Sequence, residues 1–154
     1  MKLFKDMKLI PTAVLVALVL ASCATPAPEP GVESVTASID VINSGDSAAL
    51  LDLSSVPFAF DAEILKRGED VLLLWDRLFD AGFNLSDAEI ISIDPVNEQS
   101  FARFYDGFEM QTFFERYLSG QPAIARIGSG ESEYLLIVGG STGSELFGMK
   151  GPIR

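Results

Sequence analysis

Apolar positions recur with a helical period early in the chain and with a period of two near its end. Between Ser34 and Asn43 the apolar residues fall three or four positions apart, and Gly45 follows as a helix stop. Asp46 comes next, where its carboxylate can accept bonds from the first backbone N–H groups of SAALLDL. The pattern therefore predicts two consecutive helices that meet at a Gly-Asp joint.

A third helix is predicted over EDVLLLWDRLFDAG, which Gly68 precedes and which ends at Gly82. The acidic residues at its start suit the positive end of the helix dipole. Its apolar residues form one stripe that should face the core, made of Val71, Leu74, Trp75 and Leu78.

Strands are predicted on both sides of this helix. Residues 56–64 alternate between apolar and polar positions, which is typical of one half-buried strand. EIISIDPV is a second strand, stopped by Pro95, because proline cannot donate to a strand ladder. After Pro122 the chain holds three apolar stretches with Gly- and Ser-rich turns between them, AIARIG, EYLLIVGG and ELFGMKGPI.

The stretch from residue 97 to 119 supports two interpretations. The Asp106-Gly107 pair between aromatic stretches is typical of a hairpin turn. The apolar residues that follow instead have helical spacing up to Gly120, which favours a helix from about Gly107 to Leu118. The aromatic residues here form either a core layer or an exposed patch for a partner, and they are Phe101, Phe104, Phe108, Phe113, Phe114 and Tyr117.

Helices first and strands last predict an α+β domain, with N-terminal helices packed on a mainly antiparallel curved sheet. The order is similar to that of the nuclear transport factor 2-like superfamily, with its SnoaL-like and cystatin-like folds. The resemblance lies in VINSGDSAALLDL, FAFDAEI and KRGEDVLLLWDRLFDAGF, which match its first two helices, first strand and third helix. It implies a cone-like sheet, and residues 97–119 depart from it because they are longer than the usual insertion.

The beginning of the chain has the pattern of an export signal. Three lysines, Lys2, Lys5 and Lys8, precede an uncharged apolar run from Ala13 to Ala21. The run is too short to span a bilayer, which takes about 20 apolar residues. Translation starts at either Met1 or Met7, because the sequence MKL occurs at both.

The signal ends in Leu20-Ala21-Ser22-Cys23, which resembles the lipobox of bacterial lipoproteins. In that family the cysteine is diacylated and becomes the first residue of the mature chain. The alternatives are an ordinary signal peptide with an incidental cysteine, and an uncleaved anchor. On the lipoprotein interpretation, residues 1–22 are the signal peptide, residues 23–33 a Pro-rich tether and residues 34–154 a single domain.

The resemblance also implies a location. Ala24, where retained lipoproteins carry Asp, is similar to the pattern of cargo exported to the outer membrane of the bacterial cell envelope. The membrane partner would then be held through the lipid on Cys23, and the domain would face either the periplasm or the cell surface.

Charge and composition exclude several classes of function. The chain of 154 residues has one Cys and no His, so it lacks an intrachain disulfide and the commonest metal ligand and general base. Residues 1–22 hold three of the 11 basic and one of the 22 acidic side chains, which leaves eight against 21, a formal charge of −13. Such a body is a poor partner for nucleic acid and is repelled by an anionic lipid surface, so the tether must provide the attachment.

Candidate chemistry is sparse. GGSTG, residues 139–143, matches the Gly-x-Ser-x-Gly elbow of hydrolases, but no His is present and a turn between two strands is predicted there. In enzymatic members of the resembled superfamily, carboxylates and tyrosines in the cone do acid–base work. The corresponding ligand-binding candidates are Asp61, Trp75, Asp76, Arg103 and Tyr105. We expect no catalytic residue, metal or cofactor, because solvated faces and core packing explain these side chains.

The leading hypothesis is a lipid-anchored, non-enzymatic envelope domain that binds a protein or another envelope component. The alternatives are a small cone domain that binds an apolar ligand beside Trp75, and an enzyme that relies on carboxylate and Tyr. A filled core would oppose both alternatives, whereas a pocket of about 300 Å³ or more with converging polar groups would favour them.

Replacing Cys23 with alanine should move the protein from the membrane fraction to the soluble fraction, or leave it unprocessed, because the acyl chains provide the membrane affinity. Cell fractionation measures the shift, and mass spectrometry of the N-terminal peptide measures the acyl mass. A wild-type peptide without acyl mass would contradict the lipoprotein interpretation.

Overall fold

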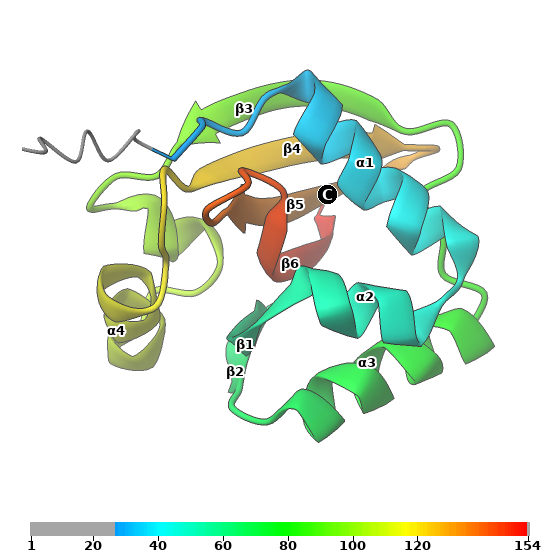
Figure 1. The fold of residues 1–154 in the computed structure, drawn as a ribbon, viewed down its shortest axis with the longest axis horizontal. Helices are drawn as coiled ribbons and strands as arrows, with labels where there is room; N and C mark the ends of the chain where they lie inside the picture. The colour runs from blue at the N-terminus through cyan, green and yellow to red at the C-terminus, as the bar shows by residue number, and fades with distance from the viewer. Residues whose placement is uncertain (1–26, 154) are drawn as a thin grey trace, which may run out of the picture.

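The computed structural model describes residues 27–153, so Cys23 and the predicted signal peptide lie outside it (Figure 1). The helices are α1 (Val32–Ser44), α2 (Ser47–Leu53), α3 (Gly68–Asp80), the 3₁₀ turn η1 (Ser100–Arg103) and α4 (Phe108–Arg116). The strands are β1 (Ser54–Phe60), β2 (Glu63–Leu65), β3 (Glu89–Pro95), β4 (Ala123–Ser129), β5 (Ser132–Gly139) and β6 (Glu145–Ile153). Across the described range, no helix has the length and hydropathy to cross a membrane.

The strands form one curved sheet in the order β2-β1-β6-β5-β4-β3 (Figure 1). Every neighbouring pair is antiparallel except β1 and β6, which run parallel. Helices α1, α2 and α3 cover one face of this sheet. The predicted α+β class, with N-terminal helices on a mainly antiparallel curved sheet, is therefore confirmed.

The joint between α1 and α2 forms as its sequence predicts. Gly45 adopts a left-handed φ of 69°, which ends α1, and the Asp46 carboxylate accepts bonds from the N–H groups of Ala48 and Ala49 at 3.0 Å. Asn43 then ties the end of α1 to the loop after α3. Its side chain accepts from the Leu85 N–H at 2.7 Å and donates to the Leu85 carbonyl at 3.2 Å.

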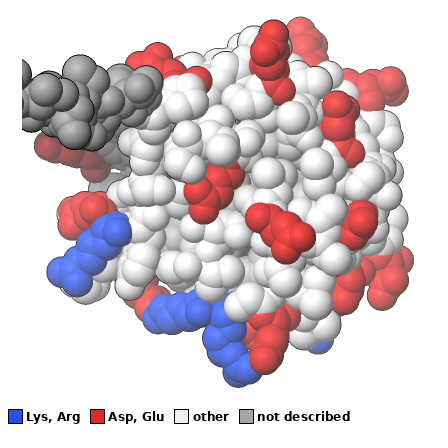
Figure 2. Space-filling model, viewed as in Figure 1, with Lys and Arg blue, Asp and Glu red and all other residues white. Residues whose placement is uncertain are grey.

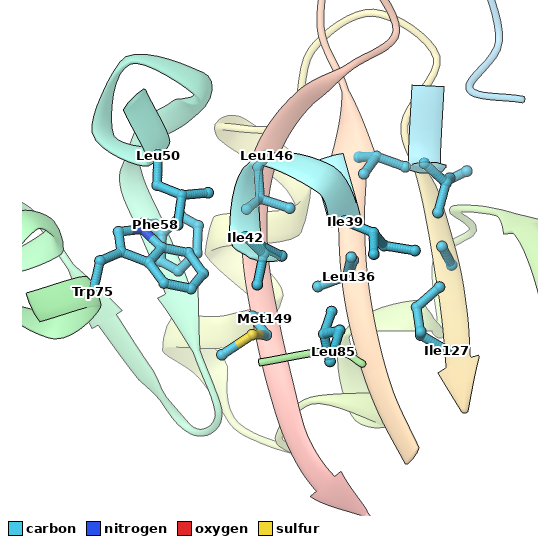
Figure 3. Packing of buried hydrophobic residues seen from close by; sticks show 14 of the residues in the cluster. Ile39, Ile42, Leu50, Phe58, Trp75, Leu85, Ile127, Leu136, Leu146 and Met149 are labelled. Carbon is cyan, nitrogen blue, oxygen red and sulfur yellow. The ribbon is translucent and has the colours of Figure 1, made fainter. Parts of the chain in front are cut away.

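The face under α1, α2 and α3 is filled by apolar side chains (Figure 3). Trp75 is 0% exposed and packs edge-on against Phe58, with ring centroids 5.9 Å apart. Ile39 and Ile42 extend from α1 toward the strands, where the buried Leu136, Leu146 and Met149 meet them. We call this cluster the concave core.

A second apolar layer covers the opposite face of the sheet. There η1 and α4 bury Phe104, Met110 and Phe113 against side chains of four strands, Ala59, Ile124, Leu135, Ile137 and Phe147. Lys150 Nζ fastens the layer to β6 by donating to the carbonyls of Arg103 and Phe104 at 2.8 and 2.6 Å. We call residues 100–117, which comprise η1, α4, the residues between them and Tyr117, the α4 layer.

The ambiguous stretch is thus helical, and the helix predicted from about Gly107 to Leu118 is confirmed as α4. Helix α4 lies on the face of the sheet opposite α1, α2 and α3. The prediction of a single strand over residues 56–64 is wrong. Asp61 adopts a left-handed φ of 51° and turns the chain, so that β1 and β2 pair as a hairpin with Phe58 opposite Leu65.

Gly148→Ala should destabilise the fold, because Gly148 lies where β6 meets β1. An added Cβ would stand 2.7 Å from the Ala59 carbonyl oxygen and 2.9 Å from the Ala59 Cβ. We expect a loss of about 1–3 kcal/mol in the free energy of unfolding, measured by urea denaturation of the mature chain. Gly68→Ala at the start of α3 is the matched control, since the only atom within 4 Å of a Cβ there is Leu51 Cδ1, at an ordinary contact distance of 3.7 Å. Equal stability of the two variants would contradict the close approach of β1 and β6.

Candidate functional site

The concave core holds Trp75, the most distinctive of the predicted ligand-binding residues. Its ring stacks on Phe79 with centroids 6.2 Å apart and also contacts Phe58, and its Nε1 reaches Ser54 Oγ only at 3.4 Å. All of these partners belong to the protein itself. Trp75 is therefore a packing residue that the chain already surrounds.

Asp61 occupies the turn between β1 and β2, where it holds the backbone together. Its carboxylate Oδ1 accepts from the Gly151 N–H at 3.0 Å, and its own N–H donates to the Met149 carbonyl at 3.0 Å. Both bonds join the β1–β2 turn to β6. The geometry assigns Asp61 a structural role, because its carboxylate already accepts a backbone bond.

Arg103 and Tyr105 lie in the α4 layer, on the opposite side of the sheet from Trp75. Arg103 pairs with Asp94 of β3 at 3.2 Å, and Tyr105 is 54% exposed with its ring beside Gly107. Asp76 is exposed on α3. Arg103 and Tyr105 therefore lie on one side of the sheet and Trp75 on the other. The structure does not gather the predicted residues around one cavity.

Several hollows lie on the described surface, and one of about 480 Å³ borders the concave core at Ile39 and Leu85. The largest of those found has a volume of about 620 Å³ and lies between the β3–η1 loop and α4. Its lining is mixed, with two phenyl rings and two carboxylates among polar side chains, and comprises Val96, Asn97, Glu98, Gln99, Phe101, Gln111, Phe114 and Glu115. The predicted ligand-binding residues are not among them.

The α4 layer presents aromatic side chains outward as well as inward. Phe108 is 83% exposed, Tyr105 54% and Tyr117 49%, while Phe104 and Phe113 of the same stretch are buried. Seven large apolar residues are exposed in the part of the chain that the structure describes, and three of them belong to this layer. Of the predicted aromatic stretch, Phe104 and Phe113 thus form a core layer, whereas Phe108 and Tyr117 form an exposed patch.

Charge also sets the α4 layer apart. Figure 2 shows acidic side chains spread over the face with α1 and α2, whereas Lys and Arg gather beside α4 and the β2–α3 turn. Lys66 of that turn pairs with Glu109 of α4 at 3.0 Å, with both side chains mostly exposed. Such a pair contributes little to stability. It links the β2–α3 turn to Glu109, the residue that follows Phe108 in α4.

Replacing Asp61 with alanine should lower the free energy of unfolding by about 1–2 kcal/mol, because Gly151 loses its acceptor and alanine disfavours a positive φ. Asp61→Asn should remain close to wild type, since its side-chain oxygen still accepts and asparagine tolerates that φ. Thermal unfolding of both variants measures the difference. An Asp61→Ala variant as stable as wild type would remove the structural role.

Comparison with known proteins assigns the chain to no family. No protein-family model matches the chain, and no curated protein matches it. Among residues 27–153, no three carboxylates or other ligand side chains are grouped to hold a metal ion.

Proposed function

We propose that this protein is a lipid-anchored, non-enzymatic domain of the bacterial cell envelope that binds a protein or another envelope component through the α4 layer. The observation that carries the proposal is the exposure of Phe108, 83%, on a helix whose other side is fully packed. Large exposed apolar side chains beside polar ones are typical of contact surfaces. The anchoring part of the proposal rests on the lipobox at Leu20 to Cys23.

The filled concave core supports binding at the outer surface over binding inside the fold. In a cone-like fold a small ligand would occupy the space between the helices and the sheet. Here that space holds Trp75, Phe58 and Leu50, each 0% exposed. A ligand of ordinary size would have to displace them, at a cost of several kcal/mol in lost packing.

The resemblance to the nuclear transport factor 2-like superfamily remains part of the proposal at the level of fold. It is supported by the order of two helices, a hairpin, a third helix and then the remaining strands. Because one fold hosts many functions, this resemblance carries no activity with it. The α4 layer is where the chain differs, and the proposed binding surface belongs to this addition.

The expected partner surface is apolar at its centre and tolerates both charges at its rim. Phe108 and Tyr105 are exposed at the start of α4, and Glu109, which follows Phe108, pairs with Lys66. Aromatic residues contribute more binding energy than their number suggests when a partner buries them. Their exposure in the free domain therefore leaves binding energy available to a partner.

A photo-crosslinking amino acid placed at Phe108 of the full chain should give a discrete adduct in intact cells. The same probe at Leu73 of α3, which is 46% exposed, is the matched control and should give none. Phe108→Ser should abolish the adduct formed by a probe at Tyr105 without changing thermal stability, since exposed substitutions shift stability by about 0.5 kcal/mol or less. Equal adducts at Phe108 and Leu73, or none at either, would contradict binding through the α4 layer.

A further inference from the structure

The hollow between the β3–η1 loop and α4 lies on the same side of α4 as the exposed Phe108. Gln111 and Glu115 line the hollow from the helix, three and seven positions after Phe108, and this spacing places all three side chains on one side of α4. Phe108 itself is 83% exposed. The proposed contact surface therefore continues from Phe108 into a hollow of about 620 Å³.

Two half-buried phenyl rings, those of Phe101 and Phe114, form an apolar part of the lining. The ring of Phe114 contacts those of Phe104 and Phe113, with centroids 5.8 and 5.9 Å apart. Because Phe104 and Phe113 are buried, these contacts lie on the inner side of Phe114 and leave its outer side to the hollow. Aromatic rings attract cations that are placed over their faces.

The carboxylates give the hollow a surplus of hydrogen-bond acceptors. Glu115 accepts one bond from the Gln111 amide at 2.8 Å, whereas Glu98 has no hydrogen-bond or ion-pair partner in the part of the chain that the structure describes. None of the described residues that line the hollow is a Lys or Arg. Arg103 of η1 pairs with Asp94 instead. The lining is therefore complementary to a cation that donates several hydrogen bonds.

We propose that this hollow receives an arginine side chain of the partner protein, while apolar side chains of the same partner cover Phe108. The inference rests on the proposed function and adds the chemistry of the partner. A guanidinium group fits both parts of the lining, because it carries five N–H donors and no acceptor, and its flat face stacks on aromatic rings. A lysine ammonium group has the charge but lacks the flat face.

Charge favours this partner over two others. Residues 23–154 hold eight basic and 21 acidic side chains, so two copies of the domain repel each other. An anionic phospholipid headgroup would bring a negative charge toward Glu98 and Glu115 and is disfavoured for the same reason. An arginine from another protein instead forms charge-assisted hydrogen bonds with these carboxylates.

The test uses the full chain in intact cells, with an aromatic photo-crosslinking amino acid at position 108. Glu98→Gln and Glu115→Gln, combined in one variant, keep the size of both side chains and remove their charge. We expect the yield of the adduct to fall several-fold, because hydrogen bonds to a carboxylate are roughly twice as strong as those to a neutral amide. Glu33→Gln combined with Glu131→Gln is the matched control, since both side chains are exposed outside the hollow, and it should leave the yield unchanged. Thermal unfolding of the purified variants reports whether both remain folded.

The crosslinked peptide then identifies the partner segment. Mass spectrometry should find an arginine within a few residues of the crosslinked position. Replacing that arginine with alanine should lower the yield as much as the change at Glu98 and Glu115 does. Both changes together should lower it no further, because each removes the same contact.

The outcomes separate this inference from the proposed function. An unchanged yield in the Glu98 and Glu115 variant would overturn the arginine contact and leave the proposed function in place. A partner segment without arginine, or an adduct with lipid or with a second copy of the chain, would also overturn it. The absence of any adduct from the chain with both carboxylates intact would instead overturn the proposed function.

Discussion

The burial of β5 on both of its faces is the constraint on which the rest of the domain depends. Leu136 and Val138 point into the concave core, while Leu135 and Ile137 point into the α4 layer, and all four are at most 3% exposed. A strand buried on both sides has no solvated face. The helices α1 to α3 and the α4 layer are therefore both needed, because removing either would expose two large aliphatic side chains of this strand and those of its neighbours.

This two-sided burial explains which parts of the fold the sequence could predict. Helices α1, α2 and α3 carry their own signals, the Gly45 stop, the Asp46 cap and the Trp75 stripe, so local reasoning finds them. The position of α4 on the other face has a weaker signal. The run Leu135 to Val138 is continuously apolar, which is typical of a strand covered on both sides, whereas one covered face produces alternation.

The features that the sequence did not predict share a physical cause, which is contact between distant segments. The alternation of residues 56–64 continues through the β1–β2 turn, so only the left-handed Asp61 and its bond to Gly151 reveal a hairpin. The parallel pairing of β1 with β6 joins segments about 90 positions apart and leaves no local pattern. The sequence correctly predicted that Trp75 faces the core. It could not indicate that the sheet separates Trp75 from Arg103 and Tyr105.

The filled concave core bears on where the proposed partner can bind. Because its side chains occupy the space between the helices and the sheet, the core favours recognition at the outer surface of the fold. The exposed start of α4, with Phe108 and Tyr105, follows η1 on the flank of the sheet, and Glu109 of α4 pairs there with Lys66. Under the proposed lipid anchoring, a partner that is itself held in the envelope is favoured, because binding between two anchored partners loses less freedom than binding from solution.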